Sequence, residues 1–254
     1  MHSIPRLSFV LASPLYPVIP ESELDYFTDY EPGAYAHWVF NKGGVAGLAD
    51  LKSGKVLTQQ SAAPAYSANY LTLSGAVGNG LLTDLLEPAG TKRTMMVVVR
   101  EPNPAVTQAK PPFGTMDTTA GGGTGGIPFV TGSGAARKLY TSYLGVTSSS
   151  DTLQATPSSL WLSIVVAIDF SGGTKRVRTL VGGGAGHEAT SAGTFSASSR
   201  ALALGNGYYT IGHNSPLDYA EFIVFEGRAM SLADMQAVYL RRKARLAAGG
   251  IAVV

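Results

Sequence analysis

Residues 220–246 read AEFIVFEGRAMSLADMQAVYLRRKARL, and this stretch near the end of the chain decides the fold. Its first six residues, Ala220 to Phe225, form an apolar run rich in β-forming side chains, which predicts a buried strand. A Glu-Gly pair ends the run, and Ser231 then stands three residues before Asp234, the spacing of a helix capping box. We therefore expect a buried strand followed directly by a capped helix.

The expected helix has a single apolar face and a basic end. At 100° per residue, one arc of the helix carries Leu232, Met235, Val238, Tyr239 and Leu246. Gly249 and Gly250 are expected to end the helix, and the basic residues from Arg241 to Arg245 lie near its carboxyl end, where cations are favoured. These cations either compensate the helix end, with the stem of Arg242 packed in the apolar arc, or meet an acidic partner.

Elsewhere the chain has strand patterns separated by turns. In residues 160–170, LWLSIVVAIDF, one face carries Leu160, Leu162, Ile164, Val166, Ile168 and Phe170. A Ser-Gly-Gly turn then predicts a hairpin with residues 175–181. With further strands expected at 36–40, 70–73, 95–100 and 139–144, the patterns indicate about ten to thirteen strands. The stretch AGGGTGG, residues 120–126, is expected to be a mobile loop.

The strand–helix ending resembles the last elements of a concanavalin A-like lectin/glucanase (laminin-G-like) jelly-roll domain. Residues 37–75 are similar to the first half of such domains, most clearly in PAYSANYLTLSG at 64–75, and the strand TMMVVVR at Thr94 fits the same pattern. The chain is most similar to the members of this family that are built into tailed-phage virions. The resemblance implies an all-β, two-sheet antiparallel jelly-roll sandwich with one short C-terminal helix over residues 36–254, preceded by an extended arm.

Composition limits the class of protein and its partners. A chain of 254 residues with 31 glycines and 14% charged residues fits one large sandwich, and the absence of cysteine excludes disulfides and cysteine-based catalysis. A net charge of +2 does not indicate a nucleic-acid partner. The apolar run after Arg6 is short, and Pro14, Pro17 and Pro20 interrupt the residues that follow it, so we expect no signal peptide. No apolar run reaches the roughly 20 residues that span a membrane.

Residues 1–35 form the expected arm. Its prolines hold the backbone extended, and acidic residues alternate there with aromatic ones. Two interpretations stay open: a strap across the chain's own sandwich, or an arm that docks on a neighbouring subunit. In the second interpretation the residues that dock are Tyr16, Tyr26, Phe27 and Tyr30.

Catalytic carboxylates are not expected. A retaining glycosidase needs two carboxylates about 5–5.5 Å apart, which glucanases of the resembled family supply as Glu-x-Asp-x-x-Glu. The alternating carboxylates Glu21, Glu23 and Asp25 precede the sandwich and lack the second glutamate. Asp218 and Glu221 are three residues apart, so on a regular strand they are expected to face opposite ways.

Cofactor and metal sites are not expected either. Gly184, Gly186 and Ala189 fit a dinucleotide-binding spacing, but the residues that follow are poor helix formers, which favours a hairpin loop. The four histidines and the isolated aspartates lack the spacing of a zinc or calcium site. We therefore expect no cofactor, no metal and no enzymatic activity.

Carbohydrate recognition would use an exposed aromatic platform with polar neighbours. Such a stretch precedes the closing strand and contains Tyr208, Tyr209, His213 and Asn214, with Asn206 beside them. Tyr140 and Tyr143 are a second candidate pair. The alternative for all four tyrosines is simple packing against the rim of the sandwich.

The sequence thus favours a non-enzymatic structural protein of a bacteriophage particle, in the tail, the adsorption apparatus or the capsid decoration. It would assemble through its arm and sandwich surface with other virion proteins and with copies of itself, and would be found in the virion. The alternative is a glycan-binding module that recognises host surface polysaccharide. An unrecognised glycan hydrolase is a third hypothesis.

Overall fold

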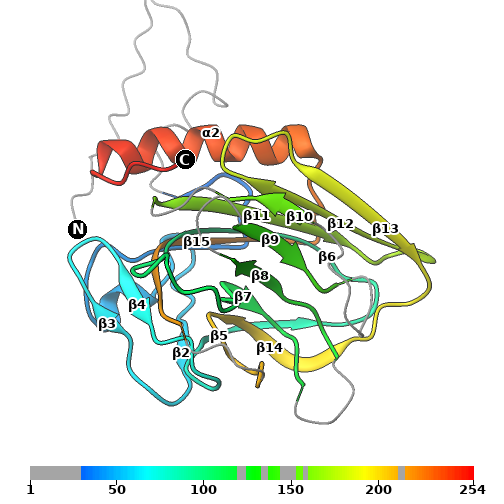
Figure 1. The fold of residues 1–254 in the computed structure, drawn as a ribbon, viewed down its shortest axis with the longest axis horizontal. Coiled ribbons are helices and arrows are strands. Elements are labelled where there is room, and N and C mark those ends of the chain that lie inside the picture. Colours follow the sequence, from blue (N-terminus) through cyan, green and yellow to red (C-terminus); the bar gives the residue numbers. More distant parts are fainter. Residues whose placement is uncertain (1–29, 119–123, 133–136, 144–152, 157–159, 211–214) are drawn as a thin grey trace, which may run out of the picture.

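The computed structural model describes residues 30–118, 124–132, 137–143, 153–156, 160–210 and 215–254. It is an all-β sandwich of two antiparallel layers, with the helix α2 (Leu232–Ala248) lying outside the larger sheet (Figure 1). This confirms the fold class expected from the sequence. No helix in the described part of the chain is long and apolar enough to span a membrane.

The larger sheet has the strand order β13-β12-β11-β6-β15-β4-β3, and β1 also pairs with β15. Its strands are β1 (Ala36–Val39), β3 (Ala65–Tyr66), β4 (Leu71–Leu73), β6 (Lys92–Arg100), β11 (Leu162–Asp169), β12 (Thr174–Val181), β13 (His187–Ala192) and β15 (Leu217–Glu226). The closing strand β15 is buried, as expected, and it is central, because it pairs with β6 on one side and with β1 and β4 on the other.

The second layer consists of two smaller sheets with the orders β2-β5-β14-β7 and β10-β9-β8. Their strands are β2 (Thr58–Gln59), β5 (Leu81–Glu87), β7 (Phe113–Gly114), β8 (Pro128–Thr131), β9 (Lys138–Thr141), β10 (Leu153–Ala155) and β14 (Ser198–Leu204). A 3-10 turn, η2 (Val45–Leu48), follows β1. The described residues thus contain fifteen strands, more than expected, because strands of two residues such as β2, β3 and β7 are too short to show a period.

The main core lies between the two layers. Phe222 of β15 stacks on Trp38 of β1 with ring centroids 5.5 Å apart and also contacts Phe113 of β7 at 5.9 Å. Each such side chain, fully buried, contributes about 1.5–3 kcal/mol through the apolar surface removed from water. These contacts join the large sheet to the second layer.

A second core lies between the large sheet and α2. The strand β11 serves both cores: Ile164 and Val166 point into the sandwich, whereas Val165 and Ala167 face the helix. The helix contributes Met235, Val238, Tyr239 and Leu246 to this second core. The apolar arc of α2 and the two faces of β11 were both correctly expected from the sequence.

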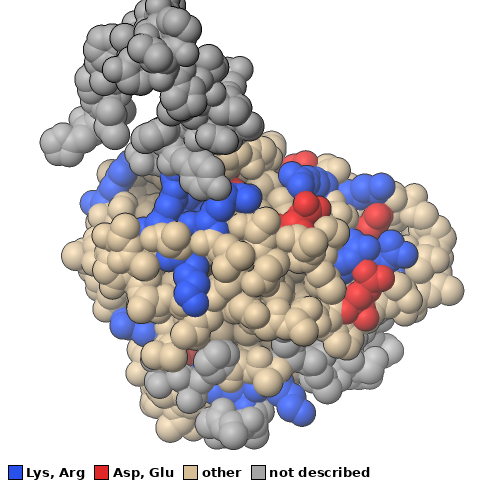
Figure 2. All heavy atoms as spheres, turned by 90° about the horizontal axis from the view of Figure 1, so that it is seen from above, with Lys and Arg blue, Asp and Glu red and all other residues tan. Residues whose placement is uncertain are grey.

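Both ends of α2 are as expected. Ser231 and Asp234 form a complete capping box, and Gly249 ends the helix. Figure 2 shows the molecule from the side of α2, where most of the visible acidic groups lie next to basic ones. Arg228 and Asp234, near the start of α2, form one such pair. The glycine-rich turn at 182–186 leads from β12 directly into β13, so it is the expected hairpin loop.

A β-bulge in β15 contradicts one expectation. The register with β6 shifts between Tyr219 and Glu221, so that one extra residue stands on β15. Because of this extra residue, Asp218 and Glu221 both lie on the helix side of the sheet, where Asp218 meets Arg100 and Glu221 meets Arg242. The expectation that these two carboxylates face opposite ways is therefore wrong.

Candidate functional site

The loop after β14 holds Tyr208 and Tyr209 in fixed positions. The buried Asn206 side chain donates hydrogen bonds to the carbonyl oxygens of Gly75 and Tyr209, both at 3.0 Å. It also accepts a hydrogen bond from the Tyr209 amide at 2.9 Å. Asn206 is therefore a structural residue of this loop, and its hydrogen bonds tie the backbone that carries the two tyrosines to Gly75.

The two tyrosine rings contact different neighbours. The Tyr208 hydroxyl donates to the Ala201 carbonyl oxygen at 2.9 Å, and the Arg200 guanidinium lies 5.4 Å from the centre of the Tyr208 ring. The Tyr209 ring meets Phe129 edge-on, with centroids 5.0 Å apart. Both tyrosines are half-buried, so part of each ring remains open to solvent.

Tyr140 belongs to the same cluster. Its half-buried ring lies 4.9 Å from Phe129, on which Tyr209 also packs. The sequence offered Tyr208–Tyr209 and Tyr140–Tyr143 as separate candidate pairs, and one member of the second pair, Tyr140, lies on the same surface as the first pair. Tyr143 does not, because it is buried in the main core against Phe170. A surface role for Tyr143 is therefore wrong.

Polar groups continue this surface. The hydroxyl oxygens of Thr118 and Thr210 are 2.8 Å apart, and the Thr210 amide donates to Thr118 at 3.1 Å. Arg200 donates from Nε to Asp117 Oδ2 at 2.8 Å. We call this contiguous set the aromatic rim; its members are Asp117, Thr118, Phe129, Tyr140, Arg200, Tyr208, Tyr209 and Thr210.

The phenols of the aromatic rim stay protonated at neutral pH. Burial raises the pKa of Tyr208, and the nearby Arg200 only partly opposes this. Burial likewise raises the pKa of Tyr140, with a further contribution from the Tyr209 hydroxyl. Neutral hydroxyls can both donate and accept hydrogen bonds, so the rim offers aromatic faces together with neutral polar groups.

Of the other candidate residues named from the sequence, the structure describes only some. His213 and Asn214 lie outside the described residues, as do Tyr16, Tyr26 and Phe27. Tyr30 is half-buried at the start of the described chain. The residue after it, Glu31, is buried and ion-paired with Arg241 of α2, which the sequence did not indicate.

Glu31 leads into a buried polar network. Its backbone amide donates to His37 Nδ1 at 2.8 Å, so the imidazole carries its proton on Nε2 and donates it to Glu221. Arg242 also binds the Glu221 carboxylate. Burial alone would raise the pKa of Glu221, but His37 and Arg242 outweigh it and lower that pKa. This network joins the strands β1 and β15 of the large sheet to α2.

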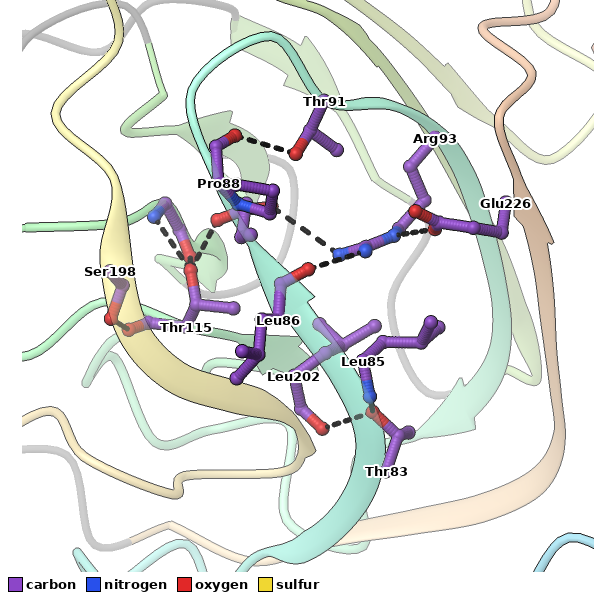
Figure 3. Close-up of polar contacts among 12 residues, drawn as sticks. Thr83, Leu85, Leu86, Pro88, Thr91, Arg93, Thr115, Ser198, Leu202 and Glu226 are labelled. Carbon is purple, nitrogen blue, oxygen red and sulfur yellow. Dashed lines mark hydrogen bonds and ion pairs between the residues drawn. The ribbon is translucent and has the colours of Figure 1, made fainter.

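A second buried cluster lies inside the sandwich (Figure 3). Glu87 is fully buried, accepts a hydrogen bond from the Thr115 hydroxyl, and has one oxygen 4.0 Å from Arg93 Nη1. Arg93 in turn donates to the Leu86 carbonyl oxygen at 2.6 Å and to Glu226 at 2.5 Å. Burial raises the pKa of Glu87 to about 7, against the opposing effects of Thr115 and Arg93. This cluster is part of the core and is closed to a substrate.

No metal centre is formed by the described residues, because none of their His, Asp and Glu side chains gather in threes or more. The carboxylates on the helix side of β15 are also engaged. Asp218 accepts hydrogen bonds from Arg100 and from the Thr72 hydroxyl, both at 2.7 Å. The aromatic rim, by contrast, brings half-buried tyrosine rings together with polar groups.

The comparisons with known proteins identify the fold. No family model and no curated protein matches the chain. Solved structures do match, among them a Trypanosoma rangeli sialidase in complex with 2,3-difluorosialic acid, with a TM-score of 0.59 and 11% identity over 84% of this chain and 34% of the sialidase. The botulinum neurotoxin serotype G binding domain matches with a TM-score of 0.53 and 11% identity, over 83% of this chain and 51% of that one.

A third match is domain 4 of an extracellular arabinanase from Geobacillus stearothermophilus, in complex with arabinotriose. It has a TM-score of 0.51 and 16% identity, and the match covers 81% of this chain and 98% of that domain. This chain thus spans about half of the neurotoxin domain and a third of the sialidase, but nearly all of the arabinanase domain. At such identities the likeness establishes the sandwich fold, in agreement with the expected concanavalin A-like jelly roll.

Proposed function

We propose that this chain is a non-catalytic glycan-binding module and that the aromatic rim is its contact surface. The observation that carries the proposal is the cluster of three half-buried tyrosines around one loop: Asn206 holds the backbone that carries Tyr208 and Tyr209, and Tyr140 of β9 shares Phe129 with Tyr209. Sugars offer apolar C–H faces to aromatic rings and hydroxyls to polar side chains, and rigid rings bind with little loss of conformational entropy.

Two further points support this function. Domain 4 of the arabinanase carries arabinotriose, so a sandwich of this kind is a sugar-bound domain in another protein. The carboxylates Asp218, Glu221 and Glu87 are each held by an arginine, a hydroxyl or both, and two of them are fully buried. None of these three has the open pairing that glycoside hydrolysis requires, which supports a binding role without catalysis.

The proposal is tested by glycan-array binding followed by titration calorimetry with the glycans retained. Tyr208→Ala and Tyr209→Ala should each weaken binding about tenfold or more, because each removes a ring at the centre of the contact. Tyr66→Ala is the matched control, since Tyr66 is also half-buried but lies on β3 of the large sheet. A wild-type protein that binds no glycan, or rim variants that bind as tightly as Tyr66→Ala, would refute the proposal.

A structural role in a virion is the second candidate. The observation that favours it is the anchoring of Glu31 by Arg241 and His37, which fixes the point where residues 1–30 join the sandwich. In this role the arm, with Tyr16, Tyr26, Phe27 and Tyr30, would dock on other virion proteins or on copies of this chain. Deleting residues 1–29 keeps Glu31 in place and should abolish self-association or incorporation without changing the melting temperature. Unchanged assembly of the truncated chain would exclude this role.

A further inference from the structure

Arg200 presents its charged end to solvent at the aromatic rim. Its side chain is 50% exposed, and it binds Asp117 through Nε, on one side of the guanidinium. Among the described residues, neither terminal nitrogen of Arg200 has a hydrogen-bond partner. Arg241 and Arg100 differ in this respect, because each uses Nε and Nη2 together on a single carboxylate.

The exposed charge at the rim is therefore positive. The Asp117 side chain is only 14% exposed, so it fixes Arg200 from below while the guanidinium faces outward beside the Tyr208 ring. Lys138 adds a second cation: it is exposed, stands two residues from Tyr140 on the same face of β9, and pairs with no carboxylate among the described residues.

The chemistry of an arginine in this state selects a ligand class. A guanidinium whose two terminal N–H groups are free matches the two oxygens of a carboxylate, in a charge-assisted bidentate hydrogen bond. Here that carboxylate would have to be attached to a group that lies on Tyr208 and Tyr209. A sugar ring bearing a carboxylate, such as a hexuronate or a sialate, satisfies both conditions.

We propose that the glycan bound at the aromatic rim is acidic, with its carboxylate on the terminal nitrogens of Arg200 and its ring on Tyr208 and Tyr209. This inference rests on the proposed glycan-binding function and specifies its ligand. Asp117 acts as a positioning residue, because it holds Arg200 by Nε and so directs the free nitrogens toward the ligand.

The test compares acidic sugars with neutral partners of the same shape. Trigalacturonate is titrated against its methyl ester, and sialyllactose against lactose, so the two arms distinguish a hexuronate from a sialate. The wild-type protein should bind one acid at least tenfold more tightly than its neutral partner, and this preference should weaken as salt is added. Arg200→Gln should abolish the preference, whereas Arg200→Lys should keep part of it as a point charge.

Arg228→Gln is the matched control, because Arg228 is 52% exposed, pairs with Asp234 and lies at the helix face, away from the rim. It should keep the preference for the acid. A wild-type protein that binds neutral and acidic partners equally overturns this inference but leaves the glycan-binding function standing, provided that Tyr208→Ala still weakens binding. If Arg200→Gln and Arg228→Gln behave alike, or if neither acid binds, the inference is also overturned. Failure of every glycan, neutral or acidic, overturns the proposed function as well.

Discussion

His37 Nε2 lies 2.7 Å from Glu221 Oε1, and both side chains are fully buried between the large sheet and α2. Arg242 of α2 reaches the same oxygen from Nε at 3.0 Å and from Nη2 at 2.5 Å. One carboxylate therefore joins the edge strand β1, the central strand β15 and the helix. The position of α2 depends on this ion pair as well as on its apolar face.

Replacing Arg242 with leucine should lower the free energy of unfolding by about 3–5 kcal/mol, because the Glu221 carboxylate is left buried without its cation. Lys243→Leu is the matched control: Lys243 is exposed one position later, and its loss should change stability by no more than about 0.5 kcal/mol. Urea unfolding measures both. Adding Glu221→Gln to Arg242→Leu should recover part of the lost stability. Equal stability of Arg242→Leu and Lys243→Leu would contradict the role of the network.

The buried Glu87 should make stability depend on pH. Its folded-state pKa of about 7 lies above the ordinary value of 4.5, so the folded state binds the proton more tightly than the unfolded state does. The resulting contribution of protonated Glu87 to the free energy of unfolding is on the order of 3 kcal/mol. It is fully present below pH 4.5 and is lost as the pH rises through 7. Glu87→Gln cannot ionise, so its stability relative to the wild type should rise over this range.

The measurement is urea unfolding at pH 5 and pH 8 for the wild type and Glu87→Gln. Asp84→Asn is the control: despite some burial, its contacts with Lys55 and Tyr35 lower the pKa of Asp84, so its contribution is lost only under more acidic conditions. It should therefore leave the difference between pH 5 and pH 8 unchanged. A Glu87→Gln variant with the same pH dependence as the wild type would rule out proton uptake by Glu87.

The capping box at the start of α2 should contribute measurably. Ser231→Ala removes the side-chain acceptor for the Asp234 amide and should lower the free energy of unfolding by about 1 kcal/mol. Ser231→Asp keeps an acceptor at the same position and should restore most of the loss. Thermal melting of the three proteins decides the matter, and identical melting temperatures would show that the cap adds nothing to the packing of the helix.

Gly126 should not tolerate a side chain. A Cβ at this position would lie 1.9 Å from Tyr143 Cδ1, so Gly126→Ala forces the buried tyrosine ring to move and should cost about 1–3 kcal/mol. Gly172→Ala is the control, because a Cβ there meets nothing within 4 Å. Denaturant unfolding should separate the two variants, and Tyr143→Leu should relieve part of the clash. Similar midpoints for both alanine variants would disprove the close contact.

Local sequence composition did not predict the structure around Gly126. Residues 120–126 were expected to form a mobile loop from their composition, but residues 124–126 are held in place: Thr124 bridges to Asp117, and the Gly126 carbonyl oxygen accepts from the Thr115 amide at 2.9 Å. Composition describes the freedom of an isolated chain. It does not reveal that Tyr143 leaves room for no side chain at position 126.

Local patterns by themselves determined several elements of the fold: the two-faced strand β11, the buried strand β15 and the capped helix α2, while the antiparallel sandwich was expected from the family resemblance. These features follow from side-chain periods of two and 3.6 and from capping chemistry, which act over a few neighbouring residues. The tertiary structure alone decided the bulge that turns Asp218 and Glu221 to one side, the network that unites Glu31, His37 and Arg242, and the meeting of Tyr140 with Tyr209 around Phe129. Those contacts join residues far apart along the chain, so their geometry depends on how the sheets and the helix pack against one another.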